Sequence, residues 1–91
     1  LRGWAHYLAI HARVPHLDAA HIVYEYRPPD RRRRDTANLY PSAKACVDGL
    51  VDAGVLDDDD SEHLTGPDPR LGPVVAGGQL ALHITELEVT R

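Results

Sequence analysis

The pattern of apolar residues between positions 21 and 54 constrains the fold of this chain more than any other feature. Residues 21–27 alternate between two faces and are rich in β-branched and aromatic side chains, which predicts a strand. A helix is predicted over about residues 38–53, with Asn38 as its N-cap and Gly54 as a left-handed C-cap. Its apolar stripe has helical spacing and consists of Ala43, Val47, Leu50 and Val51.

The remaining elements are marked less strongly. A helix is predicted over residues 1–13, and a short strand over 62–65 gives a strand–helix–strand crossover. Residues 66–73 are predicted to be turns because they are rich in Gly and Pro. Gly77-Gly78 predicts a hairpin before a last strand over 79–89, which we expect to be central in its sheet. The fold class is therefore α+β, a small mixed β-sheet with two helices packed on it.

Length and composition limit the organisation of the chain. The 91 residues are expected to form a single domain, and a core of this size would benefit from a partner subunit. No apolar run approaches the roughly 18 residues that a membrane span needs, so we expect no membrane partner. A single cysteine, Cys46, cannot build a disulfide framework and favours an intracellular setting. The chain contains no methionine, so we expect some sequence to precede Leu1.

Two opposite charge clusters are hidden in the formal net charge of −4. Residues 27–34 hold five arginines and one aspartate, and residues 57–62 hold five acids and no base. Adjacent carboxylates repel one another unless solvent, a base or a divalent cation neutralises them. A basic patch beside a metal-binding acidic patch suits phosphodiester chemistry, but two separate solvated loops would have the same composition. The predicted helix between the clusters, about 24 Å long at 1.5 Å per residue, works against a shared site.

Three stretches of this sequence together resemble a known family. The stretches are RRRRDTANL at 31–39, KACVDGL at 44–50 and AGVLDDDDS at 53–61. A basic run into Asp, a helix with Lys-Ala, an Ala-Gly turn and a paired Asp-Asp-Ser are similar to the RusA family of Holliday-junction resolvases. The resemblance covers about residues 20–90 and implies one RusA-like nuclease domain over residues 1–91.

The activity that this resemblance implies is a homodimeric, Mg²⁺-dependent endonuclease that nicks branched DNA in pairs, with Mn²⁺ as a possible substitute. Asp35 matches the family's first metal-binding aspartate, and Asp58 and Asp59 match the paired aspartates, with Asp59 favoured as the ligand. A slip of one residue would make Asp60 the ligand instead. Lys44 matches the lysine of the family helix. The family also implies a cytoplasmic protein of bacterial or phage origin.

The chemistry expected of such a site follows from its residue types. Mg²⁺ prefers oxygen ligands and would polarise the scissile phosphate and activate a water molecule. Lys44 would stabilise the negative charge that develops in the reaction or contact DNA. Four arginines would hold the phosphate backbone without sequence preference: Arg31, Arg32, Arg33 and Arg34.

Two departures from the family pattern leave an alternative open. Ala37 stands where the family usually has its second aspartate. The missing ligand would have to come from Asn38 or from one of the acids Asp57, Asp58 and Asp60. Lys44 also comes about three residues late, and it could simply pair with Asp48 at i+4 on the helix surface. The alternative is a catalytically degraded RusA-like protein that binds DNA or serves in assembly. A small metal-binding or protein-interaction domain with no DNA role is the third possibility.

Overall fold

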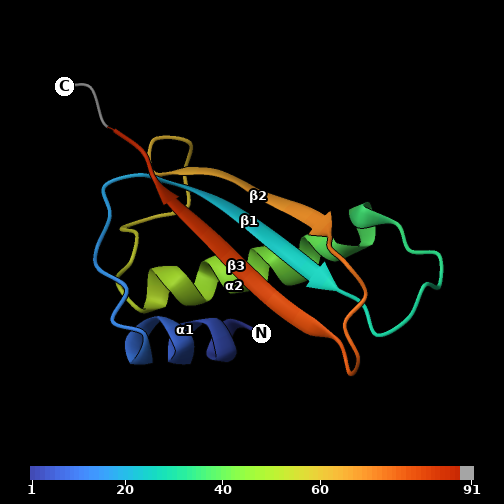
Figure 1. The fold of residues 1–91 in the computed structure, drawn as a ribbon. Coiled ribbons are helices and arrows are strands. Elements are labelled where there is room, and N and C mark those ends of the chain that lie inside the picture. Colours follow the sequence, from blue (N-terminus) through green and yellow to red (C-terminus); the bar gives the residue numbers. More distant parts are fainter. Residues whose placement is uncertain (89–91) are drawn as a thin grey trace.

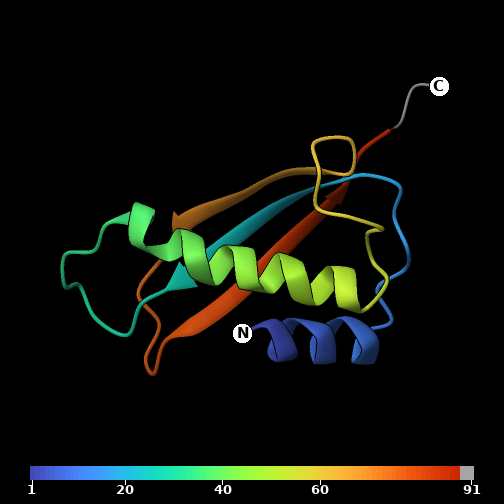
Figure 2. The same cartoon turned by 180° about the vertical axis from the view of Figure 1, so that it is seen from behind.

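The computed structural model describes residues 1–88 and is an α+β fold in which a three-strand mixed sheet carries two helices. Both helices lie on the same face of the sheet and leave the other face uncovered (Figure 1 and Figure 2). None of the helices in this part of the chain is long and apolar enough to cross a membrane. The elements in order are α1 (Arg2–His11), β1 (Ala20–Arg27), the 3₁₀ helix η1 (Thr36–Leu39), α2 (Tyr40–Asp52), β2 (Leu64–Leu71) and β3 (Gln79–Glu86).

The sheet has the order β2-β1-β3, so the first strand of the sequence is the central one. β1 pairs in parallel with β2, with Ala20 opposite Leu64 and Tyr26 opposite Leu71. This confirms the strand–helix–strand crossover through α2 that the sequence predicts. β1 pairs antiparallel with β3 along its whole length. The parallel pairing fixes which loops share an end of the sheet, and this decides where the charged segments lie.

The core lies between β1 and the two helices. Ile22 of β1 is completely buried and packs in one cluster with Val47 and Leu50 of α2. The helices approach each other closely at Gly49, where a Cβ atom would lie 2.2 Å from the carbonyl oxygen of Arg2. Any larger residue at position 49 would push α1 away from α2. The tight contact of the helices therefore depends on this glycine.

Two strand predictions are corrected by the structure. β2 continues through residues 66–71, which were predicted to be turns, although it contains Pro67 and Pro69. Proline lacks an N–H donor and is tolerated in an edge strand, which is the place of β2. β3 is the other edge strand rather than the central one, and its His83 and Thr85 are exposed. Gly77 and Gly78 have positive φ values and form a turn, but residues 74–75 before it are not a strand, so no hairpin forms.

The start of the second helix also differs from the prediction, whereas its end is confirmed. Asn38 does not cap the helix, because the chain first forms η1, whose N-cap is Asp35. The helix ends at Asp52, and Gly54 adopts the left-handed conformation with φ +81°. The predicted last strand ends at Glu86, and residue 89 of that prediction lies outside the described residues.

Candidate nucleic-acid interface

The arginine loop, residues 31–34, projects beyond the end of the sheet at which β1 and β2 finish (Figure 1). Asp30 organises it: its Oδ1 accepts hydrogen bonds from the backbone N–H of Arg32 (3.0 Å) and from Nη2 of Arg34 (2.9 Å). These two contacts, the Arg32 bond first, hold the pKa of Asp30 below its ordinary value. The loop is therefore held by one carboxylate that stays ionised.

The four arginines of this loop have different surroundings. Arg34 is turned inward: its side chain is 20% exposed, it donates to the Asp30 and Arg32 carbonyl oxygens, and its guanidinium lies 5.7 Å from the centre of the Tyr26 ring. Arg32 is 80% exposed, with a longer contact of 3.7 Å to Asp30. Arg31 and Arg33 are exposed and form no ion pair within residues 1–88. Three arginines thus present positive charge to the solvent, and Arg34 holds the loop.

Asp35 and Asn38 lie beside this loop, in the wall of a hollow of about 550 Å³. Arg33 and Arg34 line the same hollow. The Oδ1 atom of Asp35 accepts a hydrogen bond from the backbone N–H of Ala37 at 3.0 Å, as an N-cap does. The position that the family resemblance assigns to metal binding therefore has a local structural role here, next to the arginine side chains.

The acidic loop, residues 57–60, lies between the end of α2 and the start of β2. Val55 and Leu56, each 1% exposed, anchor the chain just before it in the main core cluster. The Val55 carbonyl oxygen also accepts a bond from the backbone N–H of Leu17 at 2.7 Å. The acidic loop is thus tied firmly to the core at its start, and its side chains have fixed surroundings.

Lys44 of α2 lies between two carboxylates, one on α2 and one in the acidic loop. Its Nζ atom donates to Oδ1 of Asp48 at 2.7 Å, one turn along α2, and to Oδ2 of Asp59 in the acidic loop. The two contacts, the Asp48 bond first, raise the pKa of Lys44 above its ordinary value. The bond from Lys44, and next the one with Asp58, lowers the pKa of Asp59. The lysine and aspartate singled out by the family resemblance therefore meet, and the i+4 pairing of Lys44 with Asp48 is present as well.

The other acids of this loop also have partners inside the chain. The Oδ1 atom of Asp58 accepts from the backbone N–H of Asp59 at 2.7 Å. His16 and His63 each contact one carboxylate, Asp57 at 3.0 Å and Asp60 at 2.6 Å respectively. The contact with His63 lowers the pKa of Asp60, and the same contact raises the pKa of His63. Each acid of this loop therefore has a contact inside the chain, with Lys44, with a histidine or with a backbone N–H.

Asp35 and the acidic loop do not come together in this chain. Asp35 follows the end of β1, whereas the acidic loop precedes the start of β2, and parallel strands place these points at opposite ends of the sheet. At a rise of about 2.0 Å per residue in η1 and 1.5 Å in α2, Asp35 lies roughly 15 Å from Lys44 along the helix axis. Within residues 1–88, no three or more His, Cys, Asp or Glu side chains gather closely enough to hold a metal ion. The described residues of the single chain therefore hold no preformed cluster of protein ligands for Mg²⁺, and water and substrate phosphate would have to supply most of its octahedral oxygen ligands.

Sequence reasoning did not identify the acid that holds the arginine loop or the histidines that contact the acidic loop. Asp30 and Arg34 are separated by four residues, so their spacing offered a signal for a local pair. His16 meets Asp57 across 41 residues, and no spacing rule reveals that contact. The long-range pairings depend on the sheet topology.

Comparison with known proteins adds no relationship. No protein-family model matches this chain, and no curated protein matches it either.

Proposed function

We propose that this chain binds branched DNA as a RusA-like protein and that its arginine loop contacts the phosphate backbone. The observation that carries the proposal is the set of three exposed guanidinium groups on a loop that Asp30 and Arg34 hold in place. Arginine forks match phosphate oxygens, and such contacts give affinity without reading base sequence. The preference for a branch would then come from the shape of the DNA.

Salt-dependent binding to a four-way junction tests this proposal. Labelled junction and a linear duplex of equal length are titrated with the chain at several salt concentrations, and fluorescence anisotropy is measured. The triple variant Arg31→Ala/Arg32→Ala/Arg33→Ala should lower the slope of log affinity against log salt by about 2 to 3, since each lost phosphate contact removes about 0.9. Arg34 is left unchanged because it holds the loop.

The matched control is Arg13→Asn. Arg13 is exposed, has a positive φ of 55° that asparagine tolerates, and lies after α1, away from the arginine loop. Its replacement removes one positive charge and should leave the slope nearly unchanged. If Arg13→Asn lowered the salt slope as much as Arg31→Ala, Arg32→Ala or Arg33→Ala does singly, the arginine loop would not be a dedicated contact surface. A native affinity that does not change with salt would overturn the proposal.

A second candidate function is Mg²⁺-dependent nicking of the junction, the activity of RusA-type Holliday-junction resolvases. The contact of Lys44 with Asp59 favours it, since the resemblance assigns both residues to the reaction centre. When bound, Mg²⁺ would polarise the scissile phosphate. Against this candidate, Lys44 already neutralises Asp59, and Asp35 lies at the other end of the sheet. The arrangement of residues 1–88 therefore supports binding better than cleavage.

A homodimer belongs to the same proposal. A two-fold dimer would place one arginine loop on each of two equivalent strands of a four-way junction. We also place the protein in the cytoplasm, in agreement with the buried free thiol of Cys46, whose pKa is raised by burial. Sedimentation with and without junction measures the number of chains in each complex.

Nicking is tested with a junction labelled at one 5′ end, incubated with the chain in Mg²⁺ or Mn²⁺. If the second candidate is right, Asp59→Asn abolishes nicking. Glu62→Gln, the matched control, replaces an exposed carboxylate just after the same loop and outside the candidate ligands, and this variant should keep nicking. Asp35→Asn tells whether the acid beside the arginine loop takes part. Tight junction binding by the native chain without any nicking would contradict the second candidate and leave the first in place.

A further inference from the structure

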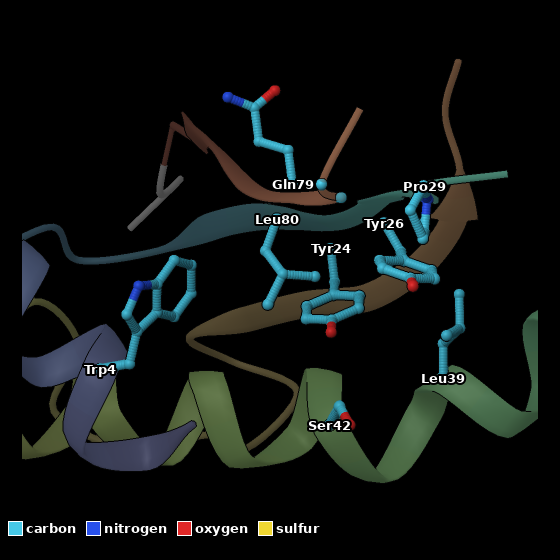
Figure 3. Close-up of a pocket in the computed structure, with 10 residues that line it drawn as sticks. Trp4, Tyr24, Tyr26, Pro29, Leu39, Ser42, Gln79 and Leu80 are labelled. Atoms are coloured by element: carbon cyan, nitrogen blue, oxygen red, sulfur yellow. The ribbon is translucent and has the colours of Figure 1, made fainter. Parts of the chain in front are cut away.

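An aromatic hollow of about 640 Å³ opens between the sheet and the helices, close to the arginine loop. Three aromatic side chains line it: Trp4, Tyr24 and Tyr26. Figure 3 shows the two tyrosines pointing from β1 toward α2, with Trp4 rising from α1 and Leu80 descending from β3. The volume lies within the range of about 300–1,000 Å³ that is typical of small-molecule sites.

The walls of this aromatic hollow suit a flat ring. Tyr24 is 3% exposed and forms a buried wall, whereas Trp4 and Tyr26 are half-buried and keep part of their surface open. Ser42 of α2 also lines the hollow and adds a polar atom. The side chain of Gln79 points away from the hollow (Figure 3), and its Oε1 atom accepts from Arg27 at 2.7 Å. The lining is therefore mixed, with aromatic and aliphatic side chains beside polar side-chain and backbone atoms.

The aromatic hollow neighbours the hollow beside the arginine loop. The two share Tyr26 and Leu39, and the second one carries Arg33 and Arg34. Arg34 lies over the Tyr26 ring and is already tied to Asp30, whereas Arg33 forms no ion pair within residues 1–88. An aromatic surface thus adjoins an exposed positive charge. This is the combination that proteins use to hold an unstacked base together with its phosphate.

We propose that the aromatic hollow receives one unstacked nucleobase of the bound DNA while Arg33 contacts a neighbouring phosphate. The inference rests on the proposed DNA binding and adds a second contact to it. Bases at branch points, bulges and mismatches are the least costly to unstack, so the hollow favours such sites over continuous duplex. Stacking on an aromatic surface tolerates every base, so the preference is for structure rather than for sequence.

Trp4 is the only tryptophan in the chain, and its fluorescence therefore reports on this hollow. The native chain is titrated with a duplex that carries a one-nucleotide bulge and with the fully paired duplex. Anisotropy of a label on the DNA measures binding, and tryptophan emission measures occupation of the hollow. The bulged duplex should bind about tenfold more tightly and should change Trp4 emission with the same midpoint as the anisotropy. The paired duplex should bind without changing the emission.

Variants at Tyr26 test the contact itself. Tyr26→Leu should remove most of the roughly tenfold preference for the bulge, because leucine offers no ring for stacking, and Tyr26→Phe should restore it. Tyr7→Leu, which replaces an exposed tyrosine of α1 that does not line the hollow, should keep the preference.

The possible failures are distinguishable. The base-binding inference would be overturned if the bulged duplex changed the anisotropy without changing Trp4 emission. It would also be overturned if the preference for the bulged duplex survived Tyr26→Leu. Either result would leave DNA binding in place. No anisotropy change with any DNA would overturn the proposed function and this inference with it.

Discussion

The arginine loop and the acidic loop differ less in the amount of charge they carry than in how much of it is matched inside the chain. Three acids of residues 57–60 contact a basic side chain, in the pairs Asp57–His16, Asp59–Lys44 and Asp60–His63. In the arginine loop one acid, Asp30, contacts two of the four arginines, Arg32 and Arg34. Arg31 and Arg33, which form no ion pair within residues 1–88, therefore keep their positive charge available to a partner, whereas each of the three acids has a side-chain contact within the fold.

The two loops also differ in how they are anchored. Two fully buried residues, Val55 and Leu56, precede the acidic loop, whereas the arginine loop follows the buried Pro28 and is held mainly by polar contacts of Asp30. A loop with apolar anchors and paired charges contributes to stability. A loop with polar anchors and spare charge contributes little to stability and can serve binding. The comparison predicts opposite consequences for substitutions in the two places.

The largest effect on stability is expected from Leu56→Ala. The substitution leaves a cavity at a residue that is 1% exposed, and such changes lower the free energy of unfolding by about 2–5 kcal/mol. Leu39→Ala, beside the arginine loop and only half-buried, should cost clearly less. Urea unfolding followed by circular dichroism measures both. Equal losses would mean that the acidic loop is no better anchored than the arginine loop.

A smaller effect is expected from Lys44→Met. The variant keeps an unbranched apolar chain but removes the cation between Asp48 and Asp59, so that two carboxylates face each other unpaired. Because Lys44 is 39% exposed and screened by solvent, the free energy of unfolding should fall by only about 1 kcal/mol. Arg2→Met removes the partner of Asp52, and because Arg2 is more exposed than Lys44 this variant should cost less stability than Lys44→Met. A Lys44→Met chain as stable as the native one would contradict the structural role of this cation.

Local sequence patterns predicted the helices, the strand β1 and the Gly54 cap, because these depend on neighbours within a few residues. The length of β2 was not predictable in this way, since Pro67 and Pro69 normally interrupt strands and are tolerated only because β2 lies at an edge. The edge position of β3 likewise depends on long-range pairing, because β3 pairs with the free side of β1 and with no further strand of the sheet. Sheet order is a property of the whole chain.

The candidate site follows the same division. The exposure of Arg32 and the pairing of Lys44 with Asp48 follow from local sequence. The contact of Lys44 with Asp59 was suggested only by resemblance, and the chain has to fold back along α2 to form it. The separation of Asp35 from the acidic loop follows from the parallel pairing of β1 and β2. Whether distant charges meet is decided by topology, and composition alone cannot reveal it.

The smallest effect concerns the His63–Asp60 pair, which should make the stability depend on pH. The contact raises the pKa of His63 above its ordinary 6.5 and lowers the pKa of Asp60 below its ordinary 3.8. The contribution is therefore fully present between about pH 4 and 6.5. It is lost as pH rises through the folded value of His63 or falls through that of Asp60. His63→Gln should thus cost more stability at pH near 5.5 than at pH near 8.5.

Thermal unfolding at the two pH values measures this difference, and Asp60→Asn is the matched variant on the other side of the pair. The two single variants should lose stability in the same pH range, and the double variant should lose no more than the larger single loss, because they remove one interaction. A cost of His63→Gln that is the same at both pH values would mean that His63 supports β2 by packing alone. The acidic loop would then have one electrostatic contact fewer, and its contrast with the arginine loop would rest mainly on Lys44.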